Sequence, residues 1–393
     1  MTASEKAPDW DTIRKLFPAT NDFVYLDGAN KGALPKCVGE ATQDWLRIVY
    51  DKAGIGAFSM DEIERTRNAV ATTFGASPEC IALVKNTSEG INILAQGIGL
   101  KPGENVILSR GEHENNTFPW RHLEGRGVEV RWVEEDKNYI YPLEAYEKLI
   151  DSNTRVVTVA WVTYGVGYRA DLRALAELCH SRDALLFVDG VQGVGILNER
   201  IDDLGVDALS AGGHKAMFSL AGAGFLYVRK EIISQIDPPY AAKFSFTSND
   251  RMKEKVKLAA DAHRFEYGNP NYLGTFVQRR GCEFIKSIGL NHIEDRVKEL
   301  STFLIESALQ RGYKIRTPRG WHQRAGIVSM DMGKDAQVIA DSLAEQKIRV
   351  SCKDSHLRAT VHFYNNEDDI VRYLDILGTV QLAFRSPYSH LKR

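Results

Sequence analysis

Four short segments carry polar side chains of the kinds that act in catalysis, and each follows an apolar run. The stretch "LSAGGHK" ends in Lys215, and "FVDGVQ" contains Asp189. "LVKNTSEGIN" places Thr87 and Ser88 ahead of a helical pattern, and "ILSRGEHENN" places His113 after an apolar run. Taken singly, each has an ordinary reading: a surface lysine, a turn carboxylate, a helix N-cap and a structural histidine. Their joint occurrence points to chemistry.

Together these residue types match the needs of one cofactor, pyridoxal phosphate. It forms a Schiff base with a lysine amine, and an acid beside its pyridine nitrogen keeps the ring protonated and electron-accepting. Its phosphate needs an anion site, which a helix N-terminus with hydroxyls and free N–H groups provides. An imidazole can cover the ring and relay protons. Because burial and neighbouring cations lower the pKa of a lysine, its amine becomes free to attack. We therefore expect Lys215 to hold this cofactor.

The elements that must position these side chains are short strands separated by helices. Apolar runs at residues 81–84, 105–108, 128–133, 155–162, 184–189, 208–212 and 223–228 predict seven strands. Helical connections of ten or more residues favour crossovers and a mainly parallel sheet. Such sheets bind ligands at the carboxyl ends of their strands, so the four segments are expected to converge at one edge.

The chain is expected to fold as an α/β protein in three parts. After about residue 272 the pattern changes to two long helical stretches, short strands and a closing helix. We predict an N-terminal segment (1–25) that packs with a small α+β C-terminal domain (272–393), and a large cofactor-binding domain (26–271) between them. No long linker separates these parts, so a ligand cleft between them is expected.

Composition excludes several classes of protein. The 393 residues include 50 basic and 52 acidic side chains, for a net charge of −2, so neither nucleic acid nor membrane is expected as a partner. The five cysteines are scattered without a CxxC pair, so neither a disulfide framework nor a metal site is expected. The first residues lack an apolar signal core, and no apolar stretch reaches about 20 residues. We therefore expect a cytoplasmic protein.

With these residues in view, the chain resembles the class V aminotransferase family of fold-type I pyridoxal-phosphate enzymes. This family includes cysteine desulfurases, kynureninase and isopenicillin N epimerase. The resemblance runs from "VYLDGAN" (24–30) to "RATVHFYNNEDDI" (358–370). It implies the fold-type I architecture, with a mainly parallel seven-stranded sheet in the large domain, and it implies a homodimer that acts on a small-molecule amino acid.

The resemblance also implies roles for individual residues. In the large domain Thr87, Ser88 and His214 would contact the phosphate, His113 would stack on the ring, Asp189 would meet the ring nitrogen, Gln192 would reach the ring hydroxyl, and Lys215 would form the Schiff base. Tyr164 stands near the ring hydroxyl where many desulfurases carry an asparagine. Asn269 stands where many relatives carry a threonine that reaches the neighbouring subunit's phosphate. Arg358 would grip the substrate carboxylate, and Asn30, Tyr164, His356 and the loop around Lys353 would contact the substrate side chain.

The sequence departs from the desulfurases in its sulfur chemistry. A desulfurase needs a nucleophilic cysteine on a mobile loop well upstream of the carboxylate-binding arginine. The nearest thiol, Cys352, precedes Arg358 by only six residues. We expect Cys352 to be a packed residue or part of the substrate wall, so persulfide chemistry is disfavoured.

Proton removal by Lys215 from an external aldimine would give a quinonoid with three possible fates. We predict an aminotransferase-type reaction. A C–S or other β-lyase that lacks a persulfide cysteine is the second alternative, and an amino-acid epimerase is the third. The fold does not decide among them.

A rival reading rests on a dinucleotide fingerprint. Gly165, Gly167 and Ala170 form a G-x-G-x-x-A pattern between a strand and a helix, and Asp189 follows 19 residues after Ala170. An NAD-binding oxidoreductase is therefore a distant alternative. However, the fingerprint normally opens a domain, whereas several strands precede this one, and it leaves Lys215 without a role. A cofactor-binding regulator without catalysis is the non-enzymatic alternative.

Overall fold

The computed structural model describes residues 7–248, 252 and 255–385. Residues 1–6, 249–251, 253–254 and 386–393, which belong to the three predicted parts, lie outside the described residues. Within the described part no helix is both long enough and apolar enough to cross a bilayer.

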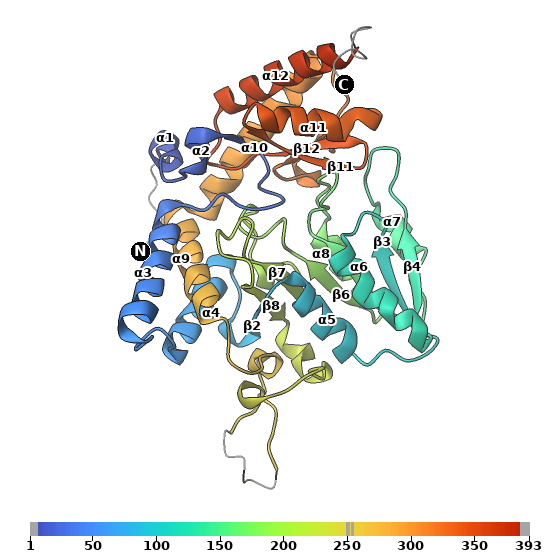
Figure 1. Cartoon of the computed structure of the whole chain (residues 1–393). Helices are drawn as coiled ribbons and strands as arrows, with labels where there is room; N and C mark the ends of the chain where they lie inside the picture. Colours follow the sequence, from blue (N-terminus) through green and yellow to red (C-terminus); the bar gives the residue numbers. More distant parts are fainter. Residues whose placement is uncertain (1–6, 249–251, 253–254, 386–393) are drawn as a thin grey trace.

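A seven-stranded sheet lies at the centre of the larger part of the molecule (Figure 1). In sheet order its strands are β2 (Ile81–Val84), β8 (Gly224–Val228), β7 (Ala208–Gly212), β6 (Leu185–Asp189), β5 (Thr154–Ala160), β3 (Asn105–Ser109) and β4 (Glu129–Val133). Neighbouring strands from β7 to β4 pair in parallel, and β8 runs antiparallel between β7 and β2. The predicted α/β fold with a mainly parallel seven-stranded sheet is confirmed.

Helices cover both faces of this sheet, which explains why its strands read as unbroken apolar runs. On one face Val106 and Leu108 of β3 pack with α5 (Thr87–Gly97) and α6 (Glu114–Arg121). On the other face Ile107 packs with α4 (Met60–Phe74), α8 (Leu172–His180) and α9 (Tyr272–Ile288). Since successive side chains of a strand point to opposite faces, a central strand must be apolar at every position.

A second core lies above the sheet in Figure 1, between a small antiparallel sheet and three helices. The sheet has the order β11 (Ser351–Lys353), β12 (His356–Thr360) and β9 (Ile327–Asp331). The helices are α10 (Leu290–Gln310), α11 (Ala336–Glu345) and α12 (Glu367–Arg385). The C-terminal part of the chain therefore has an apolar core of its own, separate from the two cores that cover the faces of the large sheet.

The N-terminal segment adds to this second core. Its elements are α1 (Trp10–Arg14), α2 (Ala19–Asp22) and β1 (Val24–Tyr25), which pairs in parallel with β10 (Ile348–Arg349). Arg14 also forms an ion pair of 2.7 Å with Asp369 of α12. The remaining α-helices of the described residues are α3 (Lys36–Lys52) and α7 (Leu143–Glu147). The exact domain boundaries stay a prediction.

The loop after β1 runs against the backbone of Lys215. The N–H of Gly32 donates to the carbonyl oxygen of His214 at 2.9 Å, and the side chain of Gln192 donates to the carbonyl oxygen of Ala29 at 2.8 Å. A Cβ at position 32 would lie 2.1 Å from the carbonyl oxygen of Lys215, closer than any real contact. Glycine at this position therefore allows the loop to approach the lysine.

We predict that Gly32→Ala destabilises the protein because its methyl group must displace backbone atoms of Lys215. The expected loss in the free energy of unfolding is about 1–3 kcal/mol, the usual cost of overpacking. Chemical denaturation of the purified variant measures it.

Gly39→Ala is the matched control. A Cβ there meets nothing within 4 Å, and the position lies inside α3, so the change should be neutral or stabilising by up to about 1 kcal/mol. Equal stability of the two variants would contradict the proposed close approach.

Candidate active site

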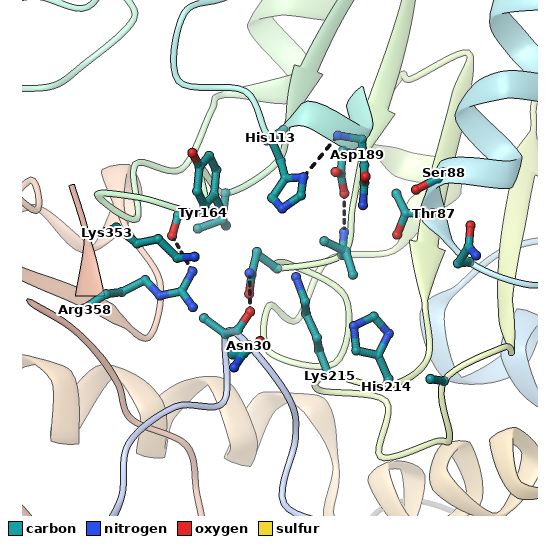
Figure 2. Close-up of a pocket in the computed structure, with 18 of the residues that line it drawn as sticks. Asn30, Thr87, Ser88, His113, Tyr164, Asp189, His214, Lys215, Lys353 and Arg358 are labelled. Atoms are coloured by element: carbon teal, nitrogen blue, oxygen red, sulfur yellow. Dashed lines mark hydrogen bonds between the residues drawn. The ribbon is translucent and has the colours of Figure 1, made fainter. Parts of the chain in front are cut away.

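A cavity of about 350 Å³ lies where five strands of the large sheet end (Figure 2). The residues that follow β2, β3, β5, β6 and β7 line it, as expected for the carboxyl edge of a parallel sheet. The loop after β1 and the β11–β12 hairpin supply the rest of its wall. The lining residues predicted from sequence are Asn30, Thr87, Ser88, His113, Tyr164, Asp189, Gln192, His214, Lys215 and Arg358, and Lys353 joins them.

Two predicted site residues do not line this cavity, although the contact predicted for Asn269 is with the neighbouring subunit's phosphate and stays a prediction. Asn269 lines a neighbouring cavity together with Lys85 and Tyr267, and the two cavities share Gly222. His356 is buried in β12, where its Nδ1 lies 3.4 Å from a guanidinium nitrogen of Arg316. The segment at Gly165 covers this histidine, because a Cβ there would lie 3.9 Å from the imidazole Nε2. The structure therefore does not bring His356 into contact with the cavity.

Lys215 and Asp189 form the electrostatic centre of the cavity. Burial lowers the pKa of Lys215 to about 8, and the nearby cations of Arg358 and Lys353 act in the same direction, while Asp189 opposes them. Asp189 is buried at 5% exposure, and burial raises its pKa, while Lys215 and His113 lower it. One carboxylate oxygen accepts from the N–H of Val191 at 3.0 Å. Within the described residues its second oxygen remains available to a ligand.

The start of α5 lies on the side of the cavity away from Arg358 and has groups that could hold an anion (Figure 2). The side chain of Asn86 accepts from the N–H of Glu89 at 2.9 Å and so caps the helix. The hydroxyl of Thr87 accepts from the N–H of Gly212 at 2.9 Å, which ties this turn to the end of β7. The N–H groups of Thr87 and Ser88 and their two hydroxyl hydrogens remain for a ligand, and a helix start favours an anionic one.

His113 is the N-cap of α6, and this position fixes its imidazole. Its Nδ1 accepts from the N–H of Asn115 at 3.1 Å, so a neutral ring carries its proton on Nε2. Burial lowers the pKa of His113, which favours this neutral form. The imidazole packs edge-on against the Tyr164 ring at a centroid distance of 4.9 Å. The cavity thus has an oriented imidazole beside the Asp189 side chain (Figure 2).

Arg358 is held in place by groups from three parts of the chain. Its guanidinium donates to the carbonyl oxygen of Tyr164 at 2.8 Å and to the Ser351 hydroxyl at 3.2 Å. Asp27 lies 3.7 Å away, and burial lowers the pKa of the guanidinium. Its Nε is buried without a hydrogen-bond partner among the described residues. An arginine held in this way can pair with a ligand carboxylate.

Glu112 is buried beside the cavity without lining it, and the sequence gave it no predicted role. Its carboxylate accepts from the Ser109 hydroxyl, from the Asn116 amide at 2.7 Å and from the N–H of Ala160 at 2.8 Å. These partners belong to β3, α6 and β5, so one side chain joins the three elements around His113. Burial raises the pKa of Glu112 to about 7, although its hydrogen bonds oppose the shift. The only sequence signal was an acid beside the candidate histidine.

None of the five cysteines, all of which lie in the described residues, lines the cavity. Cys352 pairs with Leu357 in the β11–β12 hairpin and packs on the second core. Burial and the Asp354 carboxylate raise the pKa of its thiol, which disfavours the nucleophilic thiolate. The expectation that Cys352 is a packed residue agrees with this placement.

Comparison with known proteins places the whole chain beside one family. The family model described as "Aminotransferase class-V" matches residues 24–373. An uncharacterized aminotransferase, YcbU, of Bacillus subtilis is 27% identical, covering 93% of this chain and 96% of the relative. A probable cysteine desulfurase of Methanothermobacter thermautotrophicus is 29% identical, covering 92% and 95%. The apo structure of a cysteine desulfurase from Thermococcus onnurineus has a TM-score of 0.86 at 27% identity, covering 97% of this chain and all of that one.

We predict that Glu112→Gln removes a pH dependence of stability. The folded protein raises the pKa of Glu112 from 4.5 to about 7, so it binds this proton more tightly than the unfolded chain does. The stability contributed by protonated Glu112 is therefore complete below about pH 4.5 and is lost as the pH rises through about 7. Relative to the variant, the wild type should lose on the order of 2–3 kcal/mol over this interval. Denaturation at a series of pH values measures it.

The control for this experiment is Glu144→Gln, an exposed carboxylate of α7 for which the described residues give no ion pair. Its difference from the wild type should not change over the same pH interval. A flat difference for Glu112→Gln as well would show that Glu112 titrates normally in the folded protein.

Proposed function

Since the chain belongs to the class V aminotransferase family and is a pyridoxal-phosphate-dependent enzyme, we propose that it transforms an amino acid by an aminotransferase-type reaction. The observation that carries this proposal is the geometry of Lys215. Its amine has a pKa lowered to about 8, and it lines a cavity with a buried carboxylate and a pinned arginine. The lowered pKa gives the amine a larger unprotonated fraction near neutral pH than an ordinary lysine has, and this form can accept a proton from the substrate.

The donor set of the cavity fits pyridoxal phosphate. The start of α5 offers N–H groups and hydroxyls to a phosphate, and Asp189 offers a free, buried carboxylate oxygen to the pyridine nitrogen. Lys215 would hold the aldehyde carbon, and His113 would cover the ring. Gln192 already donates to the Ala29 carbonyl, and its amide has a second hydrogen for the ring hydroxyl. The individual roles remain part of the proposal.

When bound, the cofactor supplies an electron sink for the negative charge left at the α-carbon of an amino acid. Arg358 binds the substrate carboxylate through its guanidinium and so orients the α-carbon toward Lys215. The Lys215 amine then takes the α-proton and can return it to another atom. His113, with a neutral ring, shields this proton from bulk water. Asp189 would stabilise a proton on the pyridine nitrogen, because its carboxylate and the positively charged ring would pair in a buried site.

The placement of the thiols favours transfer of the amino group over persulfide chemistry. A desulfurase-type step requires a thiolate at the substrate sulfur, and the described cavity lining contains no cysteine. Lys215 then remains as the group that moves protons at the substrate carbons. The Lys215 amine could carry a proton from the α-carbon of the substrate to a carbon of the cofactor. Transamination requires this transfer.

A C–S or other β-lyase is the second candidate. The observation that favours it is the similarity over most of the chain to a protein described as a probable cysteine desulfurase. Such a reaction needs the same proton removal by Lys215, followed by loss of the β-substituent, and it does not require Cys352.

A product screen with the purified holoenzyme tests the proposed reaction and separates it from the lyase. Each amino acid is offered with and without a 2-oxo acid acceptor, and products are identified by mass spectrometry. Transamination gives the substrate's own 2-oxo acid only when the acceptor is present. Release of pyruvate and ammonia without an acceptor would instead establish β-elimination.

We predict that Lys215→Ala lowers turnover by at least about 10²–10⁴-fold, the usual contribution of a positioned acid–base group. Because the Schiff-base amine is also lost, borohydride should no longer attach the cofactor covalently to the chain, as intact-mass measurement would detect. Lys334→Ala is the control, because Lys334 is exposed and does not line the cavity. Its turnover and its covalent attachment of the cofactor should match those of the wild type. Full activity of Lys215→Ala would refute the assignment.

We predict that Cys352→Ser leaves turnover within about twofold of the wild type, because its side chain packs away from the cavity. Steady-state kinetics on the best substrate of the screen measure this. The opposite result would be that Cys352→Ser keeps the thermal stability of the wild type but loses nearly all activity toward cysteine. That result would favour a desulfurase mechanism.

A further inference from the structure

Two cations from the β11–β12 hairpin lie on the side of the cavity away from the α5 anion site. Figure 2 shows Arg358 and Lys353 on one side, and Thr87 and Ser88 on the other. If Lys215, Asp189 and the α5 start hold the cofactor, these two cations remain for the substrate. An amino acid has one α-carboxylate, so only one of them is needed to bind it.

The hairpin register places both side chains on the same face of the sheet. Ser351 pairs with Arg358, and Lys353 pairs with His356, so Lys353 and Arg358 are diagonal neighbours. Diagonal positions lie about 7–8 Å apart, within reach of long side chains that converge on one ligand. The turn between the strands contains only Asp354 and Ser355, with Asp354 in the left-handed region at φ +49°. This tight turn fixes the register and therefore the position of Lys353.

Lys353 differs from Arg358 in its partners. Arg358 has Asp27 at 3.7 Å and two further hydrogen-bond acceptors. The ion pairs among the described residues do not include Lys353, whose ammonium lies 5.8 Å from the centroid of the Tyr164 ring. An aromatic face carries no net negative charge, so this contact leaves the charge of the ammonium without a counterion. Lys353 thus presents an unpaired positive charge to the cavity.

The rest of the wall on this side is polar. Asn30 and Tyr164 line it, and each offers a hydrogen-bonding group (Figure 2). The apolar lining residues are small, and Ala160, Val162 and Val191 come from the strand ends beside Asp189. A large apolar side chain would therefore find few partners here, whereas an anionic one would find a cation and several donors.

We propose that the preferred substrate is a dicarboxylic amino acid whose side-chain carboxylate pairs with Lys353 while Arg358 binds its α-carboxylate. This inference rests on the proposed function, because it assumes that an amino acid reacts at Lys215. It assigns Lys353 as the residue that determines specificity. Asp27 offsets part of the charge of Arg358, so the Lys353 ammonium is the group left for the second anion.

The first test compares acidic amino acids with their uncharged isosteres. Values of kcat/KM are measured for glutamate and glutamine, and for aspartate and asparagine, with the wild type, Lys353→Met, Lys353→Arg and the surface control Lys334→Met. In the wild type the acidic member of one pair should be preferred. Lys353→Met should lose roughly 10- to 100-fold for that acid, the usual effect of removing a charged hydrogen-bond partner, and less than about threefold for its amide. Lys353→Arg should retain the preference, and Lys334→Met should match the wild type.

The second test measures binding without turnover. Succinate and butyrate carry two and one carboxylates and have no amino group, so they cannot react. Titration calorimetry with the wild-type holoenzyme should show that succinate binds more tightly than butyrate. Lys353→Met should raise the dissociation constant of succinate by roughly tenfold or more and leave that of butyrate unchanged.

The outcomes separate this inference from the proposed function. If Lys353→Met weakens the acids and the amides equally, Lys353 serves the α-carboxylate or the cofactor, and the inference is overturned while the function stands. An unchanged preference in Lys353→Met overturns it as well. If the product screen finds no amino acid that reacts, the proposed function fails, and the comparison of succinate with butyrate alone decides whether Lys353 binds a second carboxylate.

Discussion

The site depends on holding a lysine amine and a carboxylate together where protein atoms replace much of their contact with water. Removing either charge from water is costly, and each group offsets part of that cost for the other. Asp189 ends β6 and pairs with Ser210 of β7, while Lys215 follows β7 by three residues. Because the two strands are neighbours in a buried sheet, neither group can move away to find solvent. The lowered pKa of Lys215 and the raised pKa of Asp189 both follow from this placement.

This constraint explains why distant parts of the chain meet at the lysine. The loop after β1 packs on the Lys215 backbone through Gly32 and on Gln192 through Ala29. The same segment contributes Asp27, which contacts Arg358. One loop therefore connects the residues at the sheet edge to the hairpin of the second core. A shift of the second core would therefore change the position of Lys215 through this loop.

Local sequence predicted much of the fold, because strands buried on both faces must be apolar at every position and the carboxyl ends of parallel strands must meet. The residue types of Lys215 and Asp189 were enough to suggest their chemistry. Positions that depend on packing between distant segments were not predictable. His356 is covered by the Gly165 segment, and the partners of Glu112 come from three separate elements, so neither environment can be read from neighbours in sequence.

The β11–β12 hairpin shows how strand alternation alone can select the chemistry at one side of a cavity. Cys352 and Lys353 are adjacent in sequence, yet their side chains leave the strand on opposite faces. The pairing of Cys352 with Leu357 directs both toward the second core, and the pairing of Lys353 with His356 leaves the ammonium on the cavity face. A slip of one residue would exchange the two, and would place a thiol where the amine now lies. The tight turn at Asp354 and the buried Leu357 oppose that slip, so the same contacts that stabilise the hairpin keep the thiol away from the substrate and a positive charge beside it.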